Sequence, residues 1–215
     1  MDIVVINKPK GPTSHDIINK IREVTGIRKV GHAGTLDPLA TGVLVIAIGQ
    51  ENTKKLNLLI KKDKEYLATI KLGEKSNTGD QEGPISFESN CIPSNLEIDN
   101  VLLGFKGKIL QKPHKFSAIK RQGKKLYDLA RLGKDIEIEP REVEIKEMEL
   151  IKYNYPELCI RTVVSSGTYI RVLAEDIGDK LKTGAYLKDL KRTRVGEYTI
   201  EQSISIDDLW KIRVK

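Results

Sequence analysis

One carboxylate in this chain lies in a segment whose residue types suit a reactive side chain. Asp37 stands between Gly34 and Gly42, is followed directly by Pro38, and precedes an apolar run over residues 43–48. The glycines allow positive φ and a close approach to a ligand, and the proline pushes Asp37 toward an extended conformation. A carboxylate held on such a loop can serve as a nucleophile or a general base. The alternative is an ordinary Asp-Pro turn.

A carboxylate that reacts near neutral pH needs a cation and an apolar wall beside it. Arg171 stands at the start of an expected helix, after the turn that contains Gly167. Tyr66 opens an expected strand and could place its ring under a planar base. The alternatives are a surface or structural ion pair for Arg171 and a core aromatic for Tyr66.

Other chemistries lack their signatures. The three histidines, His15, His32 and His114, show no metal-ligand spacing with each other or with the cysteines. The chain has no phosphate-loop motif, no dinucleotide-binding glycine pattern and no nucleophile elbow. These patterns leave a carboxylate that works without a cofactor or metal.

Composition describes a soluble globular protein. Of the 215 residues, 39% are hydrophobic and 31% are charged. The longest apolar run has six residues, whereas a spanning helix needs about 20. The N-terminus lacks the features of a signal peptide, and Cys91 and Cys159 lie far apart without a CxxC motif. Together these features predict a cytoplasmic protein.

The excess of positive charge is concentrated in three segments. Lys and Arg number 37 against 30 Asp and Glu, which gives a net charge of +7. Basic clusters occupy residues 61–64, 120–125 and 188–194. If the fold brings them to one face, they form a surface that follows phosphates. The alternative is a set of solvated helix faces.

Periodicity and turn residues predict a single α+β domain with an inserted basic arm. Strands are expected at residues 3–6, 43–48, 66–72, near 85, near 109, and at 143–153, 158–164 and 197–200. Helices are expected at residues 14–25 with Ser14 as N-cap, from 52 or 53 to 60, and at 96–105, 126–132, 170–181 and 185–190. Residues 74–93 read as a long polar loop, and loops of that length are often functional.

Four segments resemble the signature segments of TruB-type tRNA pseudouridine synthases, in the same order and at similar separations. They are GHAGTLDPLATG at 31–42, KEY at 64–66, SGTYIR at 166–171 and YLKDLKRT at 186–193. KPKGPTS at 8–14 and QGKKLY at 122–127 also match the family's opening and its RNA-gripping insertion. The resemblance extends from residue 7 to about residue 196.

The resemblance implies that the chain isomerises uridine 55 in the T loop of tRNA to pseudouridine, without a cofactor. Asp37 would be the essential carboxylate, acting as nucleophile or as base. Tyr66 would stack on the flipped base, and Arg171 would pair with Asp37. Leu190 would form part of the apolar wall, and His32 would fill the space that the base leaves. Because flipping a nucleotide costs a few kcal/mol, a wedge and a stacking ring are needed partners.

The same resemblance implies contacts to the RNA outside the reacting site. In the inserted arm, about residues 112–141, four basic residues would hold phosphates of the T arm: Lys120, Lys124, Lys125 and Arg131. Two residues of the other matched segments, Lys8 and Tyr169, would make further contacts to the RNA. The implied fold is a mixed, mostly antiparallel sheet flanked by helices and loops. The protein is expected to be a monomer, with tRNA as its partner and no obligate protein partner or membrane.

One expected departure from the family concerns the C-terminus. Bacterial members usually carry a small RNA-binding PUA module there, and we expect residues 1–215 to be a single catalytic domain without one. Two other functions are alternatives. One is a guide-RNA-dependent pseudouridine synthase of the archaeal and eukaryotic type, and the other is a non-catalytic chaperone that refolds the T arm.

Overall fold

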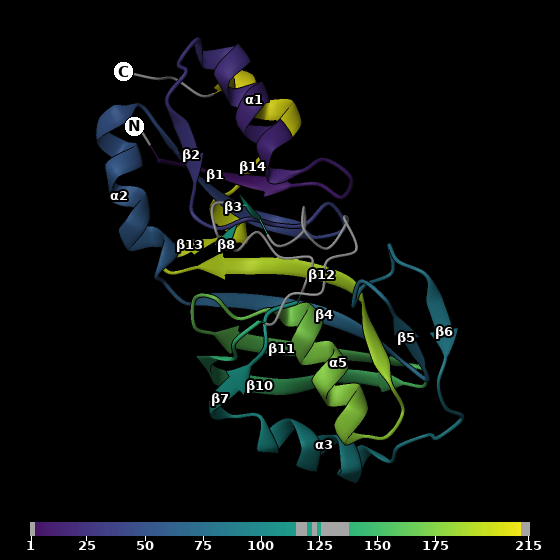
Figure 1. The fold of residues 1–215 in the computed structure, drawn as a ribbon. Helices are drawn as coiled ribbons and strands as arrows, with labels where there is room; N and C mark the ends of the chain where they lie inside the picture. Colours follow the sequence, from purple (N-terminus) through teal and green to yellow (C-terminus); the bar gives the residue numbers. More distant parts are fainter. Residues whose placement is uncertain (1–2, 115–119, 122–123, 126–137, 212–215) are drawn as a thin grey trace. The chain divides into compact units, whose positions relative to one another are not determined.

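The computed structural model describes residues 3–114, 120–121, 124–125 and 138–211 (Figure 1). The chain divides into two compact units: unit 1 comprises residues 1–67, 161–166 and 189–215, and unit 2 comprises residues 68–160 and 167–188. The main sheet has the strand order β14-β1-β3-β12-β4-β11-β10-β7. Three of its strands contribute residues to both units: β4 (Lys64–Leu72), β11 (Glu157–Val164) and β12 (Ala185–Val195).

The remaining strands of unit 1 belong to the same main sheet, in which parallel and antiparallel pairs occur together. They are β1 (Ile3–Lys8), β2 (Val30–His32), β3 (Thr41–Ile48), β13 (Tyr198–Thr199) and β14 (Ile204–Ser205). β3 pairs antiparallel with β1 and β2 and parallel with β12. From Gly42 onward β3 is buried, as expected for its apolar run. A core cluster of Val5, Ala33, Val43, Val45, Leu59 and Val195 packs around these strands.

The first helix of unit 1 has the predicted bounds, and the second begins two or three residues earlier than predicted. α1 spans Ser14–Thr25, and its N-cap is Thr13, not Ser14, because Thr13 and Asp16 form a capping box. α2 spans Gln50–Ile60 and starts after Gly49 without a side-chain cap. Two short 3-10 helices follow β13 and β14, η1 (Ile200–Gln202) and η2 (Ile206–Lys211).

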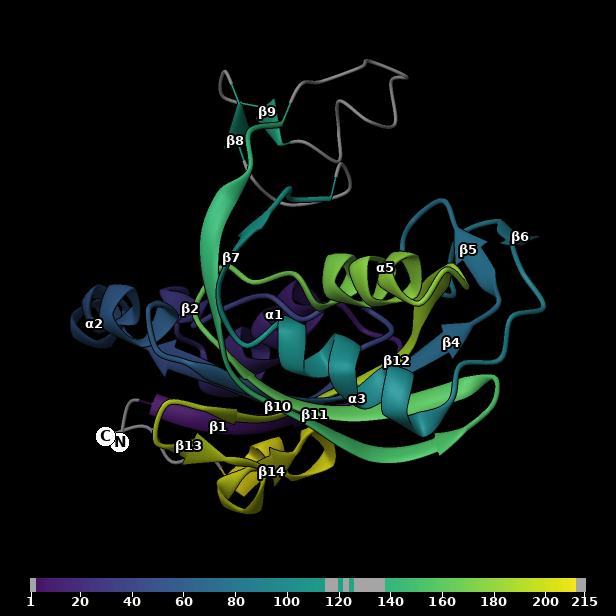
Figure 2. The same ribbon diagram turned by 90° about the horizontal axis from the view of Figure 1, so that it is seen from below.

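The described residues of unit 2 add two helices and six further strands. The helices are α3 (Asn95–Gly104) and α5 (Ile170–Lys180). The strands are β5 (Glu74–Ser76), β6 (Ile85–Phe87), β7 (Gly107–Gln111), β8 (Lys120–Arg121), β9 (Lys124–Lys125) and β10 (Arg141–Asn154). β7 and β10 pair antiparallel, and their neighbouring ends lead into the arm that carries β8 and β9 (Figure 2).

The fold class is confirmed: the chain is α+β with a large, mostly antiparallel sheet. The predicted helix at residues 185–190 is wrong, because these residues belong to β12. The short strands β2, β5, β8, β9 and β14 were not predicted. The predicted helix at 126–132 lies outside the described residues. Within the described part of the chain, no helix has the length and apolarity that crossing a membrane requires. Cys91 and Cys159 are free thiols.

Candidate active site

Asp37 lies in unit 1 on the loop that joins β2 to β3. The residue is half-buried, and its backbone carbonyl oxygen accepts a hydrogen bond from the Ala40 N–H at 3.0 Å. The turn that the Asp-Pro pair favours is therefore present. The loop begins where the Ala33 N–H donates to the Val45 oxygen at 2.9 Å, so both of its ends are fixed to β3.

Lys8 holds the C-terminal half of this loop. The residue is fully buried, and its Nζ donates to the Ala40 oxygen at 2.7 Å and to the Pro38 oxygen at 3.3 Å. The Pro38 oxygen also accepts from the Gly11 N–H at 2.9 Å. The ammonium group is thus buried against backbone carbonyls of the loop, and contact of Lys8 with RNA remains a prediction.

Ser14 holds the residue that precedes Asp37. Its Oγ donates to the Leu36 oxygen at 2.9 Å and accepts from the Leu36 N–H at 2.8 Å. Ser14 is buried at the first turn of α1. The backbone on each side of Asp37 is thus tied to a different element, α1 through Ser14 and β1 through Lys8.

Arg192 of β12 supports the N-terminal half of the loop. It is 1% exposed, and its guanidinium donates to the Val43 oxygen at 2.7 Å and to the Gly34 oxygen at 3.0 Å. The approach of β12 to β3 requires a glycine at position 42, since a Cβ there would lie 2.1 Å from the Arg192 oxygen. Gly42 also has φ of +98°, which only glycine adopts readily.

A third buried cation, Lys64, lies under the same loop. A Cβ at Gly34 would lie 3.4 Å from the Lys64 Cε. The Lys64 Nζ donates to the Lys62 and Ile60 oxygens at 2.7 and 2.8 Å. Burial, with a smaller effect of the nearby Arg192, lowers the pKa of Lys64 to about 8.

Three other predicted site residues belong to unit 1. His32 ends β2, Tyr66 lies on β4 with 7% exposure, and Leu190 lies on β12 with 8% exposure. The His32 Nδ1 is buried and has no hydrogen-bond partner among the described residues. Burial lowers the pKa of His32, and Arg192 and His15 add to this effect. The ring of His32 is therefore uncharged at neutral pH.

Arg171 lies in unit 2, in the first turn of α5, and is 9% exposed. Its Nη1 donates to Asp80 Oδ2 at 3.2 Å and to the Thr78 oxygen at 3.1 Å. Asp80 is 2% exposed and also accepts from Thr78 Oγ1 at 2.6 Å and from the Glu82 N–H at 3.1 Å. The pairing of Arg171 with Asp37 remains a prediction.

Asp80 is the residue of this arrangement that the sequence did not single out. The only signal was the long polar segment at 74–93, which contains the turn residues Asn77, Thr78 and Gly79. The ion pair of Asp80 could not be predicted from this segment, because its partner, Arg171, is on α5, about ninety residues away along the chain.

Tyr169 and the arm were predicted to contact RNA. Tyr169 precedes α5, and its backbone N–H donates to Gln111 Oε1 at 2.7 Å. In the arm, β8 and β9 pair antiparallel with Lys120 opposite Lys125 and Arg121 opposite Lys124. Arg131 lies outside the described residues. The RNA contacts of these residues remain predictions.

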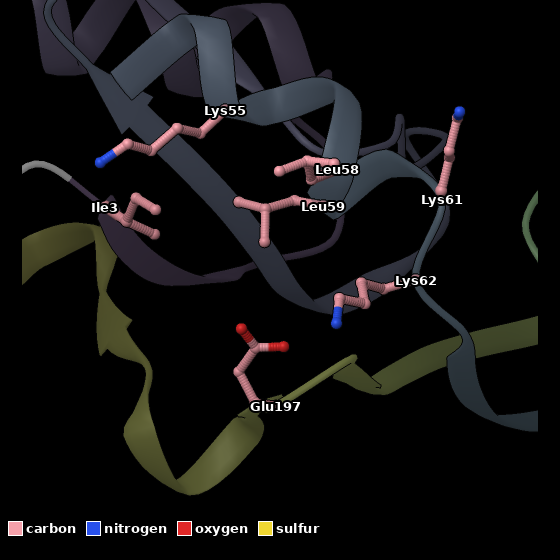
Figure 3. Close-up of a pocket in the computed structure, with 7 residues that line it drawn as sticks. All are labelled: Ile3, Lys55, Leu58, Leu59, Lys61, Lys62 and Glu197. Atoms are coloured by element: carbon pink, nitrogen blue, oxygen red, sulfur yellow. The ribbon is translucent and has the colours of Figure 1, made fainter. Parts of the chain in front are cut away.

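A separate pocket in unit 1 does not contain the predicted site. Its lining residues are Ile3, Lys55, Leu58, Leu59, Lys61, Lys62 and Glu197 (Figure 3). Lys61 points away from the other side chains. The basic cluster at 61–64 is therefore divided, because Lys64 is buried under the Asp37 loop while Lys61 and Lys62 are exposed.

Comparison with known proteins identifies the family. Residues 22–170 match the model of the TruB family pseudouridylate synthase N-terminal domain, and residues 171–214 match that of the tRNA pseudouridylate synthase B C-terminal domain. The chain is 46% identical to tRNA pseudouridine synthase B of Protochlamydia amoebophila, over 94% of this chain and 77% of that protein. It is 45% identical to the Mycobacterium bovis protein of the same name, over 96% of this chain and 71% of that protein.

Two solved structures are also similar to this chain. One is a Cbf5-Nop10-Gar1 complex, with a TM-score of 0.75 and 30% identity over 98% of this chain and 54% of that chain. Another is the archaeal box H/ACA sRNP Nop10-Cbf5 complex, with a TM-score of 0.72 and 27% identity, covering 53% of that chain. The present chain spans about half the length of these solved chains. Together with the match of the N-terminal domain model, these relatives show that the chain belongs to the TruB family of pseudouridylate synthases.

Proposed function

We propose that this chain converts uridine 55 in the T loop of tRNA to pseudouridine, with Asp37 as the essential carboxylate. Membership of the family supports pseudouridine formation, and relatives 42 to 46% identical are named tRNA pseudouridine synthase B. The observation that carries the assignment to Asp37 is the support of its loop by two buried cations, Lys8 and Arg192, which donate to loop carbonyl groups.

The reaction is an isomerisation that needs no external reactant. The bond between uracil nitrogen and the ribose breaks, the base turns, and a ring carbon forms the new bond to the same sugar carbon. The proton on that ring carbon is lost, and the free ring nitrogen takes up a proton. Asp37 would act on the ribose as nucleophile or base, and Tyr66 would stack on the base and receive or relay the departing proton.

The loop is suited to this role because its shape is set before RNA arrives. The carbonyl groups of Leu36, Pro38 and Ala40 all accept hydrogen bonds from other elements, so the backbone has little freedom to move the carboxyl group. A reacting group that is already in place avoids reorganisation in the transition state, which is a large source of catalytic rate.

The other site residues follow the same proposal. Arg171 would pair with Asp37, while within unit 2 its guanidinium donates to the buried Asp80. The uncharged ring of His32, whose buried Nδ1 lacks a partner in the described part of the chain, suits a wedge that replaces a flipped base. Leu190 would contribute to the apolar wall.

The test is Asp37→Asn, which removes the charge and keeps the shape of the side chain. We expect the wild-type protein to form pseudouridine in a T-arm hairpin at one nucleotide, mapped at nucleotide resolution, and the variant to form none while binding the RNA with nearly the same affinity. Asp99→Asn is the matched control, since Asp99 is exposed on α3. A wild-type protein that binds the hairpin but does not isomerise it would favour a chaperone instead.

The same assay separates the guide-dependent alternative. Conversion of bare tRNA without an added guide RNA or protein supports the stand-alone enzyme. A requirement for either would support the guide-dependent type. We also propose that the protein acts as a cytoplasmic monomer, which light scattering of the purified protein and its localisation in cells can test.

A further inference from the structure

Glu175 lies on α5 one turn after Arg171, at the spacing that places two helical side chains on the same face. Its carboxyl group lies over Gly79, because a Cβ added there would be 3.2 Å from Glu175 Oε1. The residues on either side of Gly79, Thr78 and Asp80, both accept from the Arg171 Nη1. One short turn therefore contacts the carboxyl group of Glu175 and the guanidinium of Arg171.

The charges around Glu175 come from three elements. From α5, Asp176 and Asp179 repel its ionised form and Arg171 attracts it. From β5, which lies beside α5 in Figures 1 and 2, Lys75 also attracts it. The turn that it covers adds the buried carboxyl group of Asp80.

Lys75 does not neutralise Glu175 by a direct ion pair among the described residues. Its Nζ lies 3.1 Å from Asp179 and 3.2 Å from Glu88. Burial and the neighbouring carboxylates raise the pKa of Glu175 to about 7, against the opposing effects of Arg171 and Lys75. Its carboxyl group therefore changes charge in the range where the protein works.

The charge of Glu175 changes the net charge of the group of side chains around Arg171. Arg171 and Asp80 form a buried pair with no net charge. An ionised Glu175 adds a negative charge beside that pair, and a negative charge opposes the approach of an RNA phosphate backbone. A protonated Glu175 leaves the pair neutral.

We propose that Glu175 is a positioning residue for Arg171 whose carboxyl group becomes more fully protonated, by uptake from solvent, when RNA binds. The proposal rests on the proposed function, since it takes Arg171 to face the RNA. The only bond that forms is the O–H bond of the carboxylic acid, its proton comes from solvent, and the proton returns to solvent when RNA leaves.

The experiment compares the affinity for a T-arm hairpin of wild type, Glu175→Gln and Glu51→Gln at constant ionic strength between about pH 6.5 and 8.5. Glu51 is an exposed residue on α2, so its variant removes the same charge away from Arg171. We expect the wild-type affinity to fall about fivefold across this range. Glu51→Gln should behave like wild type, and Glu175→Gln should lack this fall and bind more tightly than wild type at the upper pH.

A second measurement needs no variant to fold. In protein with 13C-labelled glutamate side chains, the titration midpoint of Glu175 should move to higher pH when the hairpin is added. An unmoved or lowered midpoint, or equal pH dependence in wild type and Glu175→Gln, overturns the proposal. Pseudouridine formation by the wild type on the same hairpin is measured first. If it occurs and the other results fail, only the role of Glu175 is lost; if it is absent, the proposed function fails as well.

Discussion

Arg171 owes its position in unit 2 to Asp80, and this pair gives a prediction at the scale of single residues. Asp80→Asn removes the charge but keeps an oxygen for Thr78 and the Glu82 N–H. Because a misplaced guanidinium affects the reacting state more than RNA binding, kcat should fall about tenfold or more while KM changes less. Steady-state kinetics on the T-arm hairpin measures this.

The control for Asp80→Asn is again Asp99→Asn, which makes the same chemical change on an exposed face. A purely structural role for Asp80 would lower the denaturation temperature and leave kcat of the folded protein at the wild-type value. That result would contradict the positioning role.

Lys64 gives a prediction for the pH dependence of stability. Its pKa is about 8 in the folded protein and near 10.5 in an unfolded chain. Between these values the unfolded chain binds more protons, so the contribution of Lys64 to the free energy of unfolding rises with pH from about 8 to 10.5, by roughly 1–3 kcal/mol. Chemical denaturation at the two ends of this range should show a larger increase in wild type than in Lys64→Met.

Lys61→Met is the matched control for Lys64→Met, because Lys61 is exposed in the same cluster. It should retain the wild-type increase. The prediction fails if Lys64→Met retains it too, whatever its absolute stability, since loss of the bonds to the Ile60 and Lys62 oxygens lowers stability at every pH.

The sequence singled out Asp37 as the candidate reactive residue, but it did not indicate which buried side chains support its loop. Asp37 stood out because glycines and a proline surround it, and resemblance to a family then assigned its partners. Lys8 was predicted to contact RNA and Arg192 was grouped with the basic cluster at 188–194, because charged side chains are seldom fully buried. Their burial depends on carbonyl groups of the Asp37 loop, which are 30 to 32 residues from Lys8 and about 150 from Arg192.

At the scale of elements, sequence patterns succeeded where burial and periodicity agreed. In β4, alternate residues from Lys64 to Leu72 are buried, as the expected strand requires. In β12, apolar residues at 186, 187 and 190 have helical spacing, and a helix was expected. In the strand, Leu190 and Arg192 are buried and Lys191 between them is exposed. This alternation could not be recognised from sequence, because one of the buried positions is an arginine.

The pairing of β3 with β12 depends on one glycine, which gives a prediction about an element contact. Gly42→Ala places a methyl group 2.1 Å from the Arg192 oxygen at a residue with positive φ. We expect the free energy of unfolding to fall by about 3 kcal/mol or more. Gly11→Ala is the control, since Gly11 also has positive φ but no atom within 4 Å of the added carbon, and it should cost about 1 kcal/mol. An equal decrease in the free energy of unfolding of the two variants would mean that the close approach of β12 to Gly42 does not contribute to stability.

At the scale of the whole molecule, the net charge of +7 can favour RNA binding in two ways: by long-range attraction from the whole surface, or by direct contacts of particular basic residues with phosphates. The arm offers a defined place, because β8 and β9 are a pair of strands whose four residues are all basic. Side chains that neutralise phosphates release counterions, so each such contact steepens the salt dependence of binding by slightly less than one unit.

Changing Lys120, Lys124 and Lys125 together to glutamine therefore tests whether the arm binds phosphates. The slope of log affinity against log salt should become shallower by about two to three units, and binding should weaken, while conversion at saturating RNA continues. The matched control changes Lys55, Lys61 and Lys62, exposed around α2, and lowers the net charge by the same three units. Because long-range attraction is screened by salt, the control should change the slope far less. Equal effects would assign the arm to general attraction, and loss of turnover at every RNA concentration would give it a part in catalysis.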